Sequence, residues 1–257
     1  MVALAIVVFV QLFLESLPVS SSGHIRLLEC YLQYLQKTFN FIDFDFYKPV
    51  ELCLHLPSAL IYLFFLGTSL KKELKLFCKA FWNNVLAIFV ADFITFLFFI
   101  FFKSYLSTFP LLIGFLITAL LLFSSATIKN GFKEQISLLD GTVLGIAQGL
   151  ALAPGISRLG ITYVSSLYLG FNKKFSLAIS LILAVPIFFA GTLKGCWALS
   201  ENHLVDFIAT EVIASFIVAG IMAFFALKFL LWLIEINRFW LISIYMLFPI
   251  LLSFFCL

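Results

Sequence analysis

Charged residues are scarce in this sequence, since Asp, Glu, Lys and Arg make up 11% of its 257 residues. Soluble domains carry about 25% of such residues, so a soluble globular protein is excluded. The net charge is only +3 and the basic residues lie at the ends of apolar runs, which excludes a nucleic-acid-binding surface. Five cysteines stand apart without CxxC spacing, so neither a zinc site nor a disulfide framework is indicated.

Apolar residues are what the sequence has in excess. They make up 63% of the chain, with 34 phenylalanines and a mean hydropathy of +1.15. A bilayer core about 30 Å thick is crossed by roughly 20 apolar residues in a helix. The composition therefore predicts an all-α polytopic membrane protein, a single integral membrane domain over residues 1–257. Six transmembrane helices are predicted, over residues 50–70, 84–102, 109–127, 175–195, 205–227 and 239–257.

Basic residues alternate between the loops that join these spans. The positive-inside rule places three loops in the cytoplasm, which carry Lys71 to Lys79, Lys129 with Lys133, and Lys228 with Arg238. The apolar residues 138–172 lie between Lys133 and Lys173, so both ends of this stretch are expected in the cytoplasm. We predict that it forms a re-entrant helical hairpin, which is tolerated at membrane depth only inside protein or beside a wet cavity.

Residues 1–28 form a second stretch of this kind. They precede the acidic segment FIDFDF at 41–46, which is predicted outside, so this hairpin enters from the opposite face. In both hairpins a glutamine precedes a serine by nine residues and a glycine follows that serine by three: Gln11, Ser20 and Gly23, then Gln148, Ser157 and Gly160. We predict an inverted-topology repeat with a site near the midplane, its halves being 1–127 (hairpin about 1–28) and 128–257 (hairpin about 138–172). Chance similarity between two short turns is the alternative.

The first hairpin carries a carboxylate at membrane depth. Gln11 and Glu15 are four residues apart and so share one face of a helix that Ser16 and Pro18 end. An ionised carboxylate near the bilayer centre costs about 2.5–3.5 kcal/mol, so Glu15 requires a partner, water or a metal ion. A structural glutamate bound to a backbone amide or an arginine is the alternative interpretation.

The serine run that follows suits an oxyanion. Ser20, Ser21, Ser22 and Gly23 offer three hydroxyls and successive backbone N–H groups. His24 comes next, and in the other hairpin Arg158 follows the paired Ser157; the planar fork of arginine suits phosphate. Together these groups favour hydrolysis or transfer of a phosphoryl group in a lipid-accessible pocket.

Two further polar residues lie in the spans. Asp92 is interpreted as a structural or gating residue. His55, beside Pro57, either lines the cavity or bonds a backbone carbonyl. We assign a direct role to neither.

The stretches LESLPVSSSGH and LAPGISRLG resemble the two signature motifs of the bacterial undecaprenyl-diphosphate phosphatases, the BacA/UppP family associated with bacitracin resistance. The resemblance implies an inner-membrane hydrolase that removes the terminal phosphate of undecaprenyl diphosphate and returns the carrier to peptidoglycan synthesis, hence to cell-wall biogenesis and cell shape. It also implies a pocket that opens outside the cytoplasm. A leucine, Leu159, replaces the serine that commonly follows the arginine of the second motif.

The same resemblance implies a role for each motif residue. Ser21 matches the proposed nucleophile, Glu15 a base or metal ligand, His24 a proton carrier and Arg158 the phosphate-binding arginine. The phosphate would lie among Ser20, Ser22, Gly23, Ser157 and Arg158. A divalent cation, Mg²⁺ or Ca²⁺, would be held by Glu15 and Gln11. The family motif has Glu or Gln at the position of residue 11, and this chain has the glutamine.

Three alternatives stay open on the sequence alone. The nucleophile is Ser21, His24 or metal-bound water. A lipid-phosphate flippase would use the same midplane site, although it would need Arg158 without the pair of Ser21 and Glu15. The expected partners are undecaprenyl diphosphate and the bilayer, with no nucleic acid, and a second copy of the chain is a candidate partner.

Overall fold

The computed structural model describes residues 2–36, 49, 52–201 and 210–254. Over these residues the chain is helical, with one isolated β-bridge between Lys133 and Phe171, so the predicted all-α class is confirmed. The acidic segment FIDFDF lies outside the described residues. The elements are α1 (Val2–Glu15), α2 (Ser21–Gln36), α4 (His55–Thr68), α5 (Lys71–Lys79), α6 (Phe81–Ser107), α7 (Leu111–Ser124), α8 (Leu138–Leu150), α9 (Arg158–Tyr168), α10 (Lys173–Glu201), α11 (Thr210–Glu235), η2 (Phe239–Leu241), α12 (Ile242–Tyr245) and α13 (Leu247–Ser253).

Three helices among the described residues are long and apolar enough to cross a bilayer. They are Phe81–Ser107, Lys173–Ser200 and Ile217–Glu235, with 27, 28 and 19 residues. Shorter apolar helices cover His55–Thr68, Leu111–Ser124, Leu138–Leu150 and Phe239–Ser253. Large apolar side chains on α6 and α11 face outward, where lipid is the solvent that accepts them: Phe89, Phe96, Phe101 and Phe225 are each more than half exposed. The chain is therefore a multi-pass membrane protein.

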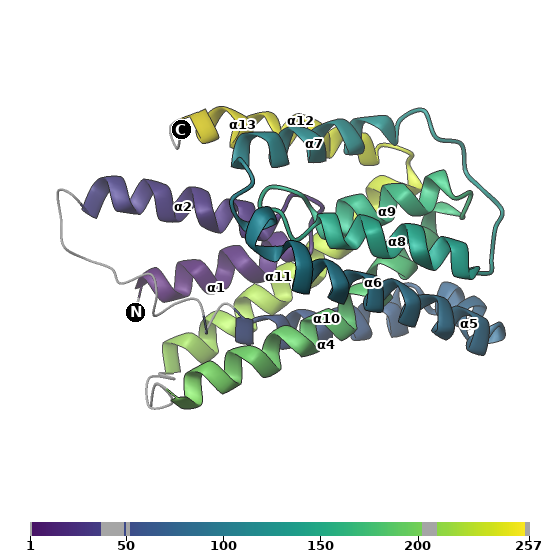
Figure 1. The fold of residues 1–257 in the computed structure, drawn as a ribbon, viewed down its shortest axis with the longest axis horizontal. Coiled ribbons are helices and arrows are strands. Elements are labelled where there is room, and N and C mark those ends of the chain that lie inside the picture. The colour runs from purple at the N-terminus through teal and green to yellow at the C-terminus, as the bar shows by residue number, and fades with distance from the viewer. Residues whose placement is uncertain (1, 37–48, 50–51, 202–209, 255–257) are drawn as a thin grey trace.

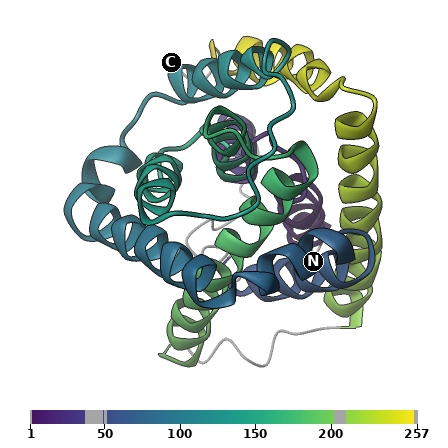
Figure 2. The same ribbon diagram turned by 90° about the vertical axis from the view of Figure 1, so that its right-hand side faces the viewer.

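Two hairpins approach each other along the long axis of the molecule. Figure 1 shows α1 and α2 running from one end toward the middle, and α8 and α9 running from the other end toward the middle. Figure 2, which looks along this axis, shows α8 and α9 inside a ring to which α6, α7 and α11 contribute. Most residues of the two turns are buried, among them Ser20 and Ser157, so the turns lie inside protein, where irregular backbone is tolerated.

Close packing fixes α8 against α6. Gly141, Gly145 and Gly149 recur every four residues along α8 and face α6. A methyl group on Gly141 would lie 2.3 Å from the carbonyl oxygen of Ala87, so only glycine allows the two backbones to approach this closely. The start of α8 is fixed by a capping box between Ser137 and Asp140.

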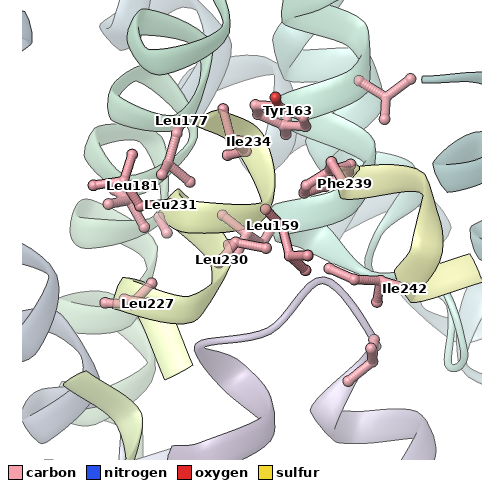
Figure 3. Close-up of a cluster of buried hydrophobic side chains, with 14 of the residues drawn as sticks. Leu159, Tyr163, Leu177, Leu181, Leu227, Leu230, Leu231, Ile234, Phe239 and Ile242 are labelled. Atoms are coloured by element: carbon pink, nitrogen blue, oxygen red, sulfur yellow. The ribbon is translucent and has the colours of Figure 1, made fainter. Parts of the chain in front are cut away.

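A buried apolar cluster holds α9 against its neighbours. Figure 3 shows side chains of α9, α10, α11, η2 and α12 meeting in one place. Van der Waals contact between such side chains is the main attraction between helices in a membrane, because lipid tails are as apolar as they are. The labelled members are Leu159, Tyr163, Leu177, Leu181, Leu227, Leu230, Leu231, Ile234, Phe239 and Ile242.

The cysteines differ from one another in state. Cys30 is disulfide-bonded, a link that the cysteine spacing did not indicate. Cys53, Cys78 and Cys196 are free.

Candidate active site

The first turn joins α1 to α2 in the way that its sequence predicts. The helix α1 ends at Glu15, a turn containing Pro18 follows, and α2 begins at Ser21. Ser20 adopts a left-handed backbone conformation with φ of +65°. Its Oγ accepts a hydrogen bond from the N–H of Gly23 at 3.3 Å, so Ser20 caps the helix.

The second turn repeats this arrangement between α8 and α9. Ser157 precedes α9 and its Oγ accepts a hydrogen bond from the N–H of Gly160 at 3.1 Å. Gly155, with φ of +84°, provides the left-handed residue here. The spacing of serine and glycine shared by the two hairpins is therefore the spacing of a helix cap, and Ser21 and Arg158 are the first residues of α2 and α9.

The two turns are in contact. A methyl group on Gly23 would lie 2.9 Å from the Cα of Gly155 and 2.8 Å from the ring of Phe115 on α7. The N-termini of α2 and α9 consequently open into one cavity. Unpaired N–H groups and the helix dipole make such ends favourable for an anion.

This cavity has a volume of about 90 Å³. Seven of the predicted site residues line it: Gln11, Glu15, Ser20, Ser21, Ser22, Ser157 and Arg158. His55, Tyr62, Phe188 and a set of apolar side chains, among them Leu14, Leu17, Ile156 and Leu159, complete the lining.

Ser21 and Glu15 form a hydrogen-bonded pair. The Oγ of Ser21 donates to the Oε2 of Glu15, and the Nε2 of Gln11 donates to the same oxygen at 3.2 Å. The hydroxyl of Tyr62 donates to the backbone carbonyl of Glu15 at 2.6 Å, which holds the end of α1. A hydroxyl beside a carboxylate is the arrangement of a nucleophile with its base.

Arg158 faces this pair from the other hairpin. Its Nη1 is buried without a hydrogen-bond partner. Its guanidinium carbon lies 5.4 Å from the centre of the Phe188 ring, a contact that orients the side chain. A buried N–H without a partner costs free energy, so this guanidinium is set up to receive an anion.

His24 lies one helical turn beyond the serines and does not line the cavity. Its Nδ1 donates to the carbonyl of Ser20 at 2.8 Å, and its Nε2 pairs with the hydroxyl of Tyr245 at 3.0 Å. Its ring also contacts Phe115 edge to face. The structure thus brings His24 to the serine turn and leaves it outside the cavity, and Gly23 does not line the cavity either.

Three lining residues were missed or left open by the sequence. His55 stacks on Phe188 with ring centres 5.0 Å apart, which decides between its two interpretations in favour of the cavity. Tyr62 lies seven residues after His55 and so on the same face of α4, a spacing that would have revealed it. Phe188 is one of 34 phenylalanines and carries no signal of its own.

Asp92 lies beside the second hairpin. Its Oδ1 accepts a hydrogen bond from the Nε2 of Gln148 at 3.0 Å. Gln148 also donates to Thr95 at 3.3 Å, which ties α8 to α6. These bonds support the structural interpretation of Asp92. Gln11, which holds the position of Gln148 in the first hairpin, instead contacts the catalytic candidate Glu15.

The oxygen donors beside Glu15 suit a hard divalent cation. The Oε1 of Gln11 is buried and without a hydrogen-bond partner, next to the carboxylate of Glu15. Mg²⁺ and Ca²⁺ prefer such carboxylate and amide oxygens. Among the residues that the structure describes, no three His, Cys, Asp or Glu side chains group together to hold a metal ion by themselves.

An apolar groove of about 430 Å³ adjoins the polar cavity. Leu14 and Leu17 line both, so the two spaces are adjacent at these side chains. The groove runs between the first hairpin and the C-terminal part of α11 with α12, and its other lining residues are Phe13, Val19, Phe229, Trp232, Leu233, Ile236, Arg238, Leu241, Ile242 and Tyr245.

The fold and the site together define a helical membrane protein that holds an anion pocket between two broken hairpins. The family model described as Bacitracin resistance protein BacA matches residues 4–251, and the chain belongs to this family. Relatives named undecaprenyl-diphosphatase match it over most of their length. That of Borrelia hermsii is 29% identical, with 96% of this chain and 95% of the relative covered. Those of Borrelia recurrentis and Treponema denticola are 30% and 31% identical, with 93% and 88% of this chain and 92% and 86% of each relative covered.

Proposed function

We infer that this chain hydrolyses undecaprenyl diphosphate to undecaprenyl phosphate and inorganic phosphate, as the names of its relatives state for them. The activity recycles the lipid carrier for peptidoglycan synthesis and underlies resistance to bacitracin. One observation carries the inference: the pair of Ser21 and Glu15 lines the same cavity as Arg158, whose Nη1 is buried without a hydrogen-bond partner.

Ser21 is the nucleophile in this proposal. Its Oγ attacks the terminal phosphorus while its proton passes to Glu15, the hydrogen-bond acceptor already in place. The bond from that phosphorus to the bridging oxygen breaks, and undecaprenyl phosphate leaves. Phosphoryl transfer depends mainly on positioning and charge stabilisation, which Arg158 and the two helix N-termini supply.

Around the phosphate, the remaining motif residues bind or position. Ser20, Ser22 and Ser157 line the cavity at the two helix N-termini, where their hydroxyl groups meet the phosphate oxygens. His24 acts on the site through Ser20, because its bond to the Ser20 carbonyl holds the turn that presents Ser21.

A divalent cation, Mg²⁺ or Ca²⁺, belongs to the site in this proposal. Glu15 and the Oε1 of Gln11 would hold it, and oxygens of the diphosphate and water would complete the coordination. When bound, the ion neutralises negative charge on the diphosphate.

The prenyl chain of the substrate occupies the apolar groove beside the cavity. A lipid diphosphate has a charged head joined to an apolar tail, and a polar cavity beside an apolar groove, with Leu14 and Leu17 lining both, matches that shape.

We propose six transmembrane segments and two re-entrant hairpins in an inverted repeat. The hydrogen bond from a glycine N–H to the capping serine, shared by Ser20 and Ser157, and hairpins that approach from opposite ends of the long axis support a repeat of 1–127 and 128–257. With Lys71 to Lys79 in the cytoplasm, the first hairpin enters from outside, which supports a pocket that opens on the extracytoplasmic face of the inner membrane.

The flippase alternative is not favoured. Transport of a lipid phosphate requires Arg158 but gives no reason for a serine hydroxyl bonded to a carboxylate in the same cavity. The names of the relatives also state hydrolysis for them.

The test is phosphate release from undecaprenyl diphosphate by the purified, detergent-solubilised protein, with and without EDTA. Ser21→Ala and Arg158→Ala are measured alongside, and their folding is checked by thermal unfolding. Wild type is expected to release phosphate in a metal-dependent way and both folded variants to lose this activity. A folded wild type without phosphate release would overturn the proposal and make lipid transport the function to test.

A further inference from the structure

The cavity contains a histidine to which the proposed reaction assigns no role. His55 is the first residue of α4, and it lines the cavity with Ser21, Glu15 and Arg158. Its ring is stacked on Phe188, with an angle of 11° between the ring planes. Its Nδ1 is buried without a hydrogen-bond partner. The stacking thus holds an imidazole with an unpaired nitrogen beside the other cavity groups.

The proposed hydrolysis needs a proton acceptor in each of its two steps. In the first step Ser21 attacks phosphorus and Glu15 takes the proton, which leaves a phosphoserine and a protonated Glu15. In the second step water attacks that phosphorus, the bond to the Ser21 Oγ breaks, and Glu15 returns its proton to this oxygen. Because Glu15 then acts as the acid, another group must accept the proton that water loses.

The other polar groups of the cavity do not meet this need. The guanidinium of Arg158 offers hydrogen-bond donors and no acceptor, and the amide of Gln11 is no base. The hydroxyl of Tyr62 donates to the carbonyl of Glu15. His24 stands outside the lining, and its two ring nitrogens already pair with the Ser20 carbonyl and the Tyr245 hydroxyl.

We propose that His55 is the general base of the second step, a proposal that rests on the function inferred above. Its unpaired ring nitrogen accepts a proton from the water that hydrolyses the phosphoserine at Ser21. The water oxygen forms the new bond to phosphorus, the bond to the Ser21 Oγ breaks, and Glu15 protonates that oxygen. The proton on His55 then leaves with the departing phosphate.

The experiment compares His55→Gln with wild type and with His24→Gln in single turnovers of undecaprenyl diphosphate. Undecaprenyl phosphate and inorganic phosphate are followed separately, and the Ser21 peptide is examined for phosphate by mass spectrometry. His55→Gln is expected to release undecaprenyl phosphate in a burst, to slow phosphate release by roughly 10²–10⁴-fold and to accumulate phosphoserine. His24→Gln is expected to slow both products together without phosphoserine.

A His55→Gln variant that releases phosphate at the wild-type rate would overturn the proposal. Equal slowing of both products without phosphoserine would do the same, since it would place His55 before the second step. In both cases phosphate release by wild type leaves the proposed function standing, whereas wild type that forms neither product contradicts that function itself.

A second variant covers poor folding of His55→Gln. His55→Ala opens space beside Phe188, so added imidazole is expected to restore phosphate release in part. Absence of rescue in folded His55→Ala contradicts the proposal.

Discussion

Ser21 donates a hydrogen bond to Glu15 across the turn between α1 and α2. Glu15 is the last residue of one helix and Ser21 the first of the next, so the pair depends on the path of the backbone between them. That path includes Ser20 in a left-handed conformation, which costs about 1–2 kcal/mol for a residue with a side chain. Its cap on Gly23 and its bond from His24 stabilise this conformation.

Arg158→Lys is expected to lower kcat/KM for undecaprenyl diphosphate by about ten- to a hundredfold. Lysine keeps the charge but loses the fork, and a hydrogen bond to a charged group contributes about 1.5–3 kcal/mol. The measurement is steady-state phosphate release by the purified variant. Arg26→Lys is the matched control, because Arg26 is exposed and bonds the Ser107 carbonyl away from the cavity. Equal activity of Arg158→Lys and wild type would show that the planar guanidinium of Arg158 makes no paired hydrogen bonds to the phosphate.

Gln11→Glu is expected to lower the concentration of Mg²⁺ or Ca²⁺ needed for half-maximal activity by about tenfold. A second carboxylate beside Glu15 adds negative charge to the proposed cation site, and affinity rises with the charge of its ligands. Gln11→Leu is expected to raise that concentration. Titration of each EDTA-treated protein with the cation measures the effect. A metal requirement that neither variant changes would exclude residue 11 from the cation site.

Gly155→Ala is expected to lower the stability of the protein more than Gly170→Ala. Both glycines have positive φ, of +84° and +86°, so alanine strains the backbone at each by about 1–2 kcal/mol. At Gly155 the new methyl group would also lie 2.7 Å from the backbone nitrogen of Phe115, whereas at Gly170 nothing lies within 4 Å. Thermal unfolding in detergent compares the two variants. Equal unfolding temperatures would show that the hairpin and α7 separate at little cost.

Ile236→Trp is expected to raise KM for undecaprenyl diphosphate by about fivefold, equivalent to ~1 kcal/mol of lost packing. Ile236 lines the apolar groove and is 39% exposed, so the larger side chain fits the fold while it narrows the groove. A short prenyl diphosphate is expected to be affected less. Ile244→Trp is the control, since Ile244 is 54% exposed and does not line the groove. The same change in KM for both variants would place the tail elsewhere.

Much of the fold could be predicted because the membrane restricts what an apolar segment can do. Length and hydropathy located the helices α4, α6, α7 and α10 to within several residues, since a bilayer requires internally bonded backbone. The end of α1 was predicted from Ser16 and Pro18. The last predicted span was less regular than expected, because residues 239–253 form a 3₁₀ turn and two short helices.

The part of the candidate site that comes from the two hairpin motifs was predicted from the sequence. Cap spacing in each hairpin brought Ser21 and Arg158 to helix starts, and these starts meet. Residues that come from other helices were not predictable in this way, because nothing local marks Phe188 as the ring on which His55 and Arg158 lie. The position of His24 outside the cavity also depends on a distant residue, Tyr245, which bonds its ring.

The two matching caps place different side chains at the same position. Ser21 stands directly after the first capping serine and Arg158 directly after the second, so the proposed nucleophile and a cation occupy equivalent places in opposed hairpins. Two serines there would leave the phosphate without its positive partner, and two arginines would bind it without attacking it. The proposed chemistry thus depends on a broken symmetry: similar helix caps bring the two halves together, and the different residues that follow the capping serines separate attack on the phosphate from its binding.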